Sequence, residues 1–263
     1  MAYVAAVRPD AVIHLAGRVG GIGANIAAPA LFLRENLAIG VNILKAAFAA
    51  GVPRLINLGT SCMYPKDLDG VLSEDRLLTG PLEPTNEGYA TAKLAVWKLM
   101  CAMRLARPNL AWVTLIPPNL YGPFDHFEPE RSHLIAAAIA KIEGALATGQ
   151  EAVEIWGDGT ARREFLFAPD LAACLWWSLS RIRTLPETLN VGVGEDRSVD
   201  DYYAAVAASA GFRGRMTHDL NRPAGMRNKL LDSRRIHQMG WRAPTRLCEG
   251  LDRTLAFRRQ MTP

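Results

Sequence analysis

The sequence predicts an α/β protein whose core is a doubly wound parallel sheet. Short apolar runs alternate with longer segments that carry apolar residues at helical spacing. Turn residues end several of these segments, among them Gly17, Gly51 and the pair Pro117-Pro118. Up to residue 118 this rhythm indicates successive β-α-β units, in which the strands lie parallel and the helices cover the sheet.

The first part of the chain is expected to supply three strands and two long helices. We expect strands over residues 11–16, 54–58 and 112–116, and helices over residues 31–50 and 89–104. Gly51 is placed to end the first helix as a C-cap. Ligands of such sheets bind at the carboxyl ends of the strands. We therefore expect the residues that follow the strands at 60–62 and 119–122 to belong to a site.

The second part of the chain has a more mixed pattern. We expect helices over residues 132–146, 171–179, 198–211 and 246–259, and strands over residues 153–156, 163–167 and 189–193. Ser198 and Asp201 form the pattern of a capping box at the start of one helix. Pro169 suits the first turn of another. We find no internal repeat and no low-complexity segment.

Composition restricts the class of protein and of partner. The 263 residues are 49% hydrophobic and 21% charged, which is typical of a globular protein with a sizeable core. The net charge of +4 is small and scattered, so an anionic small substrate is expected rather than nucleic acid. The four cysteines show no C-x-x-C pattern, which argues against a metal site or disulfides and for a reducing compartment. Without a membrane-spanning run or a signal-peptide pattern, a cytoplasmic protein is expected.

The spacing of Tyr89 and Lys93 indicates acid–base chemistry. Residues four apart lie on one face of a helix, so the ammonium is expected to lower the phenol pKa from about 10. Thr60 and Cys62 add a hydroxyl and a thiol from a separate strand end. Together these groups suit the reduction or oxidation of a carbonyl, with a further acid–base group beside it. The alternative is an ordinary amphipathic helix with a surface tyrosine and lysine.

The glycines at positions 17, 20 and 23 match a G-x-x-G-x-x-G pattern after the first strand. One interpretation is a pyrophosphate cradle at a helix N-terminus. Two observations oppose it: the periodic helix begins near Leu31, and no acidic residue ends a following strand about 20 residues on. The other interpretation is a flexible loop beside a substrate or a nicotinamide.

Motifs spread over residues 15–241 resemble those of the extended short-chain dehydrogenase/reductases, and within them those of the GDP-L-fucose synthases. The motifs are LAGRVGGIGAN (15–25), NLGTSCMYPK (57–66), LEPTNEGYATAK (82–93), IPPNLYGPFDHF (116–127), SHLI (132–135), IWGDGTARREFL (155–166), LNVGVG (189–194) and KLLD (229–232). The resemblance implies the NADPH-dependent 3,5-epimerisation and 4-reduction of GDP-4-keto-6-deoxy-D-mannose to GDP-L-fucose. At Ala224-Gly225 the chain departs from an Asp-Gly of the family.

The resemblance also implies roles for catalytic residues. Tyr89 would protonate the C4 oxygen as hydride reaches C4, and Lys93 would lower the tyrosine pKa and bind the nicotinamide ribose. Thr60 stands where the family usually has a serine. Cys62 and His133 match the epimerisation pair. The C4 ketone acidifies the protons on C3 and C5, so a thiolate and an imidazole can exchange them.

Further residues match binding positions of the family. The resemblance assigns the cofactor NADP to Leu58, Gly59, Thr60, Ser61, Lys93, Pro117, Pro118, Asn119, Leu120 and His133. It assigns the GDP-sugar substrate to Lys141, Trp156, Arg163 and Lys229. It also implies a homodimer that forms through the helices expected at residues 31–50 and 89–104.

Family members begin with a β-α-β unit that carries a glycine-rich turn and reads the 2′-phosphate, and no counterpart of it is found in this sequence. We therefore expect an N-terminally truncated Rossmann-like sheet with a smaller mixed α/β substrate domain. The incomplete NADP-binding domain would comprise residues 1–118 and about 165–195. The substrate domain would comprise residues 119–164 and 196–263. The loop at residues 17–23 then matches a later loop of the family.

Two other hypotheses stay open. The chain could be a catalytically impaired remnant that binds nucleotide sugars, with weak affinity for NADPH. It could also be a related nucleotide-sugar epimerase or dehydratase. Dehydratases place an Asp-Glu pair near the strand end where this chain has Thr60-Ser61-Cys62, so Cys62 favours the epimerase/reductase.

Overall fold

The computed structural model describes residues 2–66, 68–128, 132–222 and 226–261. Its main sheet has four parallel strands in the order β1-β2-β3-β8, with β1 at Val12–His14, β2 at Arg54–Leu58, β3 at Ala111–Ile116 and β8 at Thr188–Asn190. Ile56 on β2 pairs with Ile13 on one side and Val113 on the other. The six residues of β3 are all buried, as expected for a central strand covered on both faces. The predicted doubly wound parallel sheet is confirmed.

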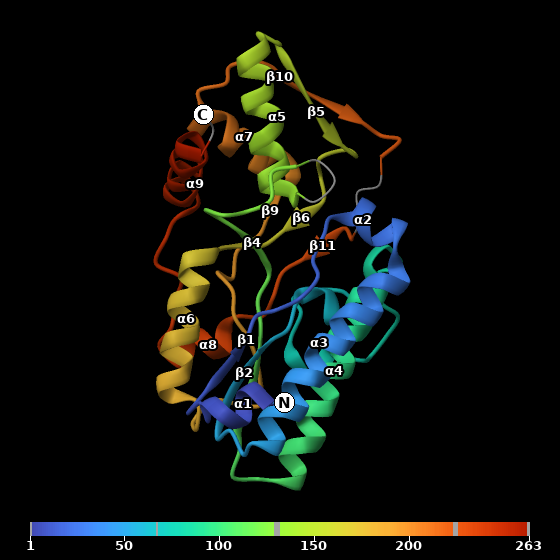
Figure 1. Ribbon diagram of the computed structural model, residues 1–263. Helices are drawn as coiled ribbons and strands as arrows, with labels where there is room; N and C mark the ends of the chain where they lie inside the picture. Colours follow the sequence, from blue (N-terminus) through green and yellow to red (C-terminus); the bar gives the residue numbers. More distant parts are fainter. Residues whose placement is uncertain (1, 67, 129–131, 223–225, 262–263) are drawn as a thin grey trace.

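Helices cover both faces of this sheet (Figure 1). They are α1 (Ala2–Val7), α3 (Pro29–Ala49), α4 (Glu87–Ala106), α6 (Ala168–Arg181) and α8 (Arg234–Gln238). The short α2 (Ile22–Ala27) packs against α3 beyond the end of the sheet. Helices α3 and α4 lie together on one face, and α6 lies on the other. The periodic helix predicted from near Leu31 is α3, which begins at Pro29. The short α2, which starts directly after Gly21, was not predicted. A six-residue helix is too short to show periodicity in the sequence.

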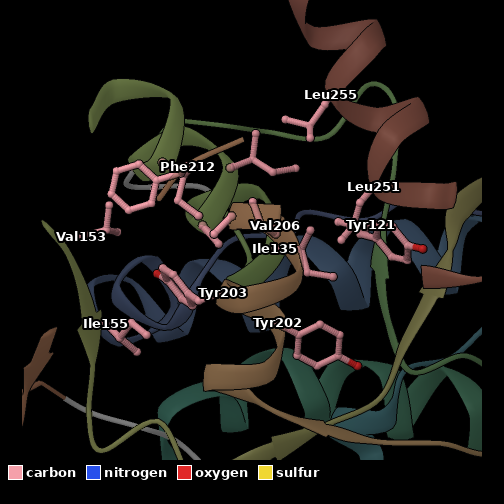
Figure 2. Close-up of a cluster of buried hydrophobic side chains, with 14 of the residues drawn as sticks. Tyr121, Ile135, Val153, Ile155, Tyr202, Tyr203, Val206, Phe212, Leu251 and Leu255 are labelled. Carbon is pink, nitrogen blue, oxygen red and sulfur yellow. The ribbon is translucent and has the colours of Figure 1, made fainter. Parts of the chain in front are cut away.

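Small sheets and three helices form the other end of the molecule (Figure 1). The strands are β4 (Asn119–Tyr121) with β7 (Phe165–Phe167), β5 (Ala152–Trp156) with β10 (Arg215–Asp219), and β6 (Arg162–Arg163) between β9 (Arg197–Ser198) and β11 (Asn228–Lys229). The helices are α5 (Leu134–Thr148), α7 (Val199–Ala210) and α9 (Leu247–Met261). Their apolar faces meet in one cluster that includes Ile135, Val206 and Leu251 (Figure 2). The predicted capping box of Ser198 and Asp201 is confirmed at the start of α7.

Three short 3-10 helices complete the described elements: η1 (Ser61–Met63), η2 (Glu74–Arg76) and η3 (Pro84–Asn86). η1 directly follows β2 and carries Cys62, while η3 leads into α4 and ends at Asn86. Ala224 and Gly225 lie outside the described residues. Across the described ranges, no helix has the length and apolarity needed to cross a lipid bilayer.

Candidate active site

A cavity of about 750 Å³ opens at the carboxyl ends of β1, β2 and β3. Leu58 ends β2, and Gly59 and Thr60 follow it; Pro117 and Pro118 follow β3. The opposite wall comes from the end of the molecule that holds α5, β5 and β6. This is where a parallel sheet is expected to bind its ligand, because the strand-end loops meet there.

Tyr89 and Lys93 both line the cavity from α4. The Lys93 ammonium lies 5.9 Å from the centre of the Tyr89 ring and donates a 2.9 Å hydrogen bond to the carbonyl of Leu58. Tyr89 shares a side-chain hydrogen bond with Thr60. α4 thus brings Tyr89 to the hydroxyl that follows β2, as the sequence predicts.

The expected lowering of the Tyr89 pKa is not what the structure shows. Burial raises the pKa of Tyr89, and the nearby Cys62 raises it further, whereas the hydrogen bond with Thr60 acts in the opposite direction. Burial also lowers the pKa of Lys93 to about 8. Both groups lie where water is scarce, and desolvation disfavours the charged form of each. The phenol therefore keeps its proton at neutral pH.

Cys62 receives two side-chain donors. The Lys229 ammonium lies 3.2 Å from the Cys62 sulfur, and the Asn86 amide nitrogen lies 3.5 Å from it. The backbone N–H of Cys62 donates to the Thr60 hydroxyl oxygen at 3.3 Å, which caps η1. The thiol is thus half-buried at the cavity wall with a cation beside it.

His133 lines the cavity just before α5 begins. Its side chain remains accessible through the cavity, although protein surrounds it. That surrounding protein lowers the pKa of His133; the carboxylate of Asp125 raises it, and the charges of Lys229 and His126 lower it further. Cys62 and His133 therefore share one cavity. Lys229 contacts the sulfur of Cys62, and its charge lowers the pKa of His133.

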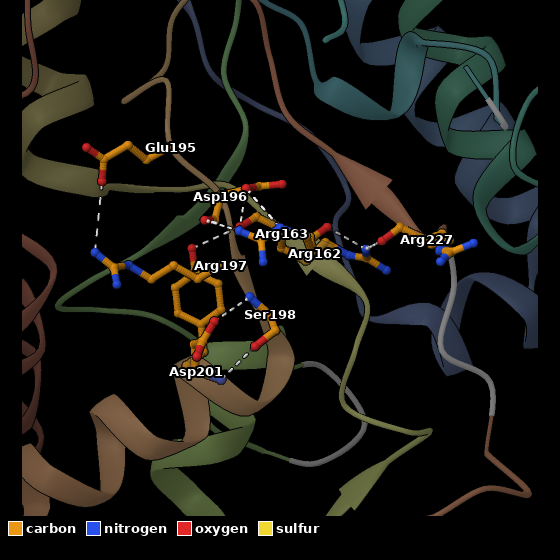
Figure 3. Close-up of polar contacts among 9 residues, drawn as sticks. Arg162, Arg163, Glu195, Asp196, Arg197, Ser198, Asp201 and Arg227 are labelled. Carbon is orange, nitrogen blue, oxygen red and sulfur yellow. Dashed lines mark hydrogen bonds and ion pairs between the residues drawn. The ribbon is translucent and has the colours of Figure 1, made fainter. Parts of the chain in front are cut away.

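The four residues expected to hold the substrate line the same cavity. The Lys141 ammonium lies 5.3 Å from the Trp156 ring centre and donates to the carbonyl of Glu154 at 2.7 Å. The ring of Trp156 is half-exposed. Burial lowers the pKa of Arg163, and Cys62 and Glu83 act in the opposite direction. Arg163 lies on β6, between β9 and β11, and its guanidinium donates to the Arg162 carbonyl at 2.8 Å (Figure 3).

The expected cofactor residues reach the cavity with one exception. Leu58, Gly59, Thr60, Lys93, Pro117, Pro118, Asn119, Leu120 and His133 line it. Ser61 lies buried beneath this surface, where its backbone N–H donates to the Pro117 carbonyl at 3.1 Å. The side-chain oxygens of Asn25 and Asn86 are buried and accept no hydrogen bond from the described residues. Both residues line the cavity, so a hydrogen-donating ligand such as a dinucleotide or a sugar fits there.

The glycine loop is anchored by two asparagines rather than loose. The Asn36 side chain exchanges hydrogen bonds with the backbone of Arg18, and the Asn25 amide donates to the carbonyls of Gly20 and Gly21. A Cβ added at Gly17 would lie 3.7 Å from the Lys93 ammonium nitrogen. The loop therefore runs beside Lys93, which supports its interpretation as a loop beside a substrate or nicotinamide.

Three residues of the site were not singled out from the sequence. Asn86 contacts the Cys62 sulfur, Asp125 acts on His133, and buried His14 lies close to Lys93. Burial and the charge of Lys93 lower the pKa of His14 to about 4. Asn86 and Asp125 stand inside motifs already recognised, at residues 82–93 and 116–127. His14 carries no such signal, because it reads as part of a buried strand.

A sequence-family model described as the NAD dependent epimerase/dehydratase family matches residues 1–192. The chain belongs to this family. It is 49% identical over 248 residues to GDP-L-fucose synthase of Azorhizobium caulinodans, covering 94% of this chain and 79% of that protein. It is 44% identical over 255 residues to GDP-L-colitose synthase of Yersinia pseudotuberculosis, covering 97% and 83%. The resemblance to GDP-L-fucose synthases drawn from the motifs is confirmed, and the chain is an enzyme of the epimerase/dehydratase family.

Solved structures of related enzymes share the fold. A GDP-6-OMe-4-keto-L-xylo-heptose reductase from C. jejuni matches with a TM-score of 0.90 at 26% identity, covering 99% of this chain and 85% of that chain. A GDP-L-fucose synthetase from Naegleria fowleri bound to NADP matches with a TM-score of 0.86 at 25% identity, covering 96% and 77%. The Rossmann-like fold expected for this epimerase/dehydratase family member is thereby confirmed.

Proposed function

We propose that this enzyme converts GDP-4-keto-6-deoxy-D-mannose to GDP-L-fucose by 3,5-epimerisation and NADPH-dependent 4-reduction. One observation carries the proposal: a single cavity holds both the Tyr89–Lys93 pair and the Cys62–His133 pair. The first pair suits carbonyl reduction and the second suits proton exchange beside that carbonyl. The relatives named GDP-L-fucose synthase and the GDP-sugar reductase neighbour support GDP-sugar epimerase/reductase chemistry.

The cofactor is NADP, as in the NADP-bound Naegleria neighbour. When bound, it supplies the hydride for reduction at C4. The strand-end residues Leu58 and Gly59 and the segment at residues 117–120 would hold it, with the Lys93 ammonium on a ribose hydroxyl. The carbonyl of Leu58 already fixes Lys93 at 2.9 Å, so the ammonium is positioned before any ligand binds.

Epimerisation uses Cys62 and His133. The Cys62 thiolate removes a proton from the carbon next to the ketone, and the electron pair of the C–H bond moves into an enolate. His133 returns a proton to the other face of that carbon, which inverts the centre. Asp125 supports the imidazolium, since its charge favours the protonated form of His133.

Reduction uses Tyr89 and Thr60. The C4 oxygen gains negative charge as the carbonyl is reduced, and the Tyr89 hydroxyl donates its proton to that oxygen. Because burial raises the pKa of Tyr89, the phenol is present in its protonated form and ready to act as an acid. Thr60 orients this hydroxyl through their shared hydrogen bond.

The GDP moiety is placed toward Lys141, Trp156, Arg163 and Lys229. The half-exposed Trp156 ring offers a flat surface for guanine. Arg163 and the two lysines supply positive charge for the diphosphate, and arginine can bind it through two parallel hydrogen bonds. We further propose a cytoplasmic homodimer that forms through α3 and α4, which sedimentation velocity can test.

The test is solvent-deuterium exchange on the purified protein with GDP-4-keto-6-deoxy-D-mannose. The wild type with NADPH should form GDP-L-fucose with deuterium at C3 and C5. Cys62→Ser should lose the exchange at both carbons while the protein still binds NADPH. Cys248→Ser, which alters an exposed cysteine, is the matched control and should behave as the wild type. Normal exchange in Cys62→Ser would remove Cys62 from the mechanism.

The same assay separates the alternatives. The identity to GDP-L-colitose synthase favours the GDP-4-keto-deoxyhexose precursor of GDP-L-colitose as a second substrate. Product analysis with both substrates shows which one the enzyme prefers. Binding of GDP without exchange or reduction would instead support the nucleotide-sugar-binding remnant. Elimination of a hydroxyl, without reduction, would support a dehydratase.

A further inference from the structure

Lys229 makes a contact that its expected role does not explain. The resemblance assigns it to the GDP-sugar, yet its ammonium nitrogen lies 3.2 Å from the sulfur of Cys62. The residue is buried, with 7% of its surface exposed. An ammonium is a donor only, and a thiolate is a far better acceptor than a thiol. The contact therefore places a positively charged donor beside the atom that carries the negative charge of a thiolate.

Other polar groups also surround the sulfur of Cys62. Asn86 directs a second N–H donor at the same sulfur from the end of η3, at 3.5 Å. Arg163 lies near enough for the two groups to interact, since Cys62 raises the pKa of Arg163. The surroundings thus offer the sulfur two N–H donors and a second positive charge. Tyr89 also lies nearby, but its phenol stays neutral because burial raises its pKa.

The backbone holds Lys229 in this place independently of any substrate. Lys229 on β11 pairs with Arg163 on β6, and its carbonyl accepts a hydrogen bond from the N–H of Glu164 at 3.2 Å. The buried carboxylate of Glu164 in turn accepts the N–H of Leu231 at 2.9 Å. The ammonium therefore extends from a short strand that hydrogen bonds and strand pairing hold against residues 163 and 164.

We propose that Lys229 is the charge partner that keeps Cys62 in its thiolate form, ready to remove the proton in epimerisation. This role rests on the proposed function and assigns Lys229 to the base rather than to substrate binding alone. In each exchange the thiolate takes a proton from carbon and becomes a thiol, while the electron pair stays on the enolate. The thiol then releases its proton to solvent, and the Lys229 side chain donates to the thiolate that re-forms.

Alkylation of the intact protein tests the proposal without any substrate. Iodoacetamide reacts with the thiolate, so its rate at Cys62, followed by peptide mass spectrometry at neutral pH, reports the thiolate fraction. Lys229→Met should slow this rate by about tenfold or more, whereas Lys229→Arg should retain most of it because the positive charge remains. Lys141→Met removes another cation of the cavity and is the matched control, with an unchanged rate. An unchanged rate in Lys229→Met would overturn the proposal.

Two further measurements separate the possible explanations. Circular dichroism and thermal unfolding of Lys229→Met check that the fold persists, and the Lys229→Arg variant carries the test if it does not. A Lys229 that acts only on the substrate would instead weaken GDP binding and raise KM in Lys229→Met, with the alkylation rate unchanged. If alkylation slows as expected but the wild type exchanges no deuterium, the Cys62–Lys229 pair stands and the proposed function fails.

Discussion

In the reaction that we propose, Tyr89 acts as a proton donor, and burial raises the pKa of its phenol. This raised pKa keeps the proton on the phenol oxygen at neutral pH. A neutral phenol is the form required to protonate the C4 oxygen during reduction. The Lys93 ammonium is expected to help once negative charge develops on the substrate, which is a transition-state effect.

Tyr89→Phe should separate the two reactions of the site. We expect it to reduce NADPH oxidation by about 10²–10⁴-fold, because the general acid is lost. Deuterium exchange at C3 and C5 should persist, since Cys62 and His133 are unchanged. The measurements are NADPH absorbance and NMR of the sugar, with Tyr3→Phe, which alters an exposed tyrosine, as the control. Equal loss of both reactions would show that Tyr89 also serves epimerisation.

Glu164 gives the fold a pH dependence. Burial raises the pKa of Glu164 from 4.5 to about 7, although the backbone N–H groups of Gly194, Leu231 and Val193 act in the opposite direction. The folded protein therefore holds this proton more tightly than the unfolded chain does. The resulting stability is complete below about pH 4.5 and is lost as the pH rises through about 7.

The comparison of wild type with Glu164→Gln measures this effect. Over the range from about pH 4.5 to 7, the wild type should lose about 3 kcal/mol of unfolding free energy relative to Glu164→Gln. Urea titrations at several pH values give the two curves. Glu151→Gln, at an exposed position, should follow the wild type. Parallel curves for wild type and Glu164→Gln would contradict the assignment.

Among the secondary-structure elements, the pair α3 and α4 depends on a close approach at one glycine. A Cβ added at Gly40 would lie 2.8 Å from Cγ1 of Val96 and closer still to Cγ2. Valine is branched at Cβ and has little rotamer freedom on a helix, so it cannot easily move away. The contact between α3 and α4 therefore requires a glycine at position 40, although glycine lowers helix propensity by about 1 kcal/mol relative to alanine.

Gly40→Ala should lower the free energy of unfolding by about 1–2 kcal/mol, because overpacking exceeds the gain in helix propensity. Gly144 on α5 is the matched control, since an added Cβ there meets nothing within 4 Å. Gly144→Ala should raise the free energy of unfolding by up to about 1 kcal/mol. Chemical denaturation measures the unfolding free energy of both variants. A change of the same sign in the two would contradict this account of the α3–α4 contact.

At the scale of the whole molecule, the cavity lies between the main sheet and the end of the molecule that holds α5 and β5. Tyr89 and Cys62 lie on the sheet side, whereas Lys141 and Trp156 come from α5 and β5. The division into a cofactor domain and a substrate domain stays a prediction. A ligand that contacts both walls of this cavity should stabilise the main sheet and the opposite end of the molecule together. The change in unfolding free energy on ligand binding therefore tests whether the ligand occupies the cavity.

GDP at about 100 times its Kd should raise the free energy of unfolding by about 2.7 kcal/mol. Trp156→Ala should weaken GDP binding by about tenfold, as stacking on a base contributes about 1–3 kcal/mol. Thermal unfolding with and without GDP measures the shift, and Trp176→Ala, at an exposed tryptophan outside the cavity lining, is the control. An unchanged shift in Trp156→Ala would place the guanine elsewhere.

The local pattern was sufficient to predict the main elements. β2 was predicted with its observed bounds, and α3, α4 and β3 within two residues at each end, because long periodic helices and buried apolar strands leave clear signals. The short polar strands β9, β10 and β11 were missed. Their pairing is set by distant partners, such as Lys229 with Arg163, which no local pattern shows.

The sequence alone determined the parallel α/β fold, the family and the residues that gather in the cavity, since these depend on periodicity and on short motifs. Only the tertiary structure decided the state of those residues. Burial reverses the expected shift of the Tyr89 pKa, and Ser61 lies beneath the cavity surface. Lys229 lies beside Cys62, which is 167 residues earlier in the chain, and β11 is held there by its pairing with β6. Desolvation and long-range contacts arise only when distant segments pack together, so they are absent from any local pattern in the chain.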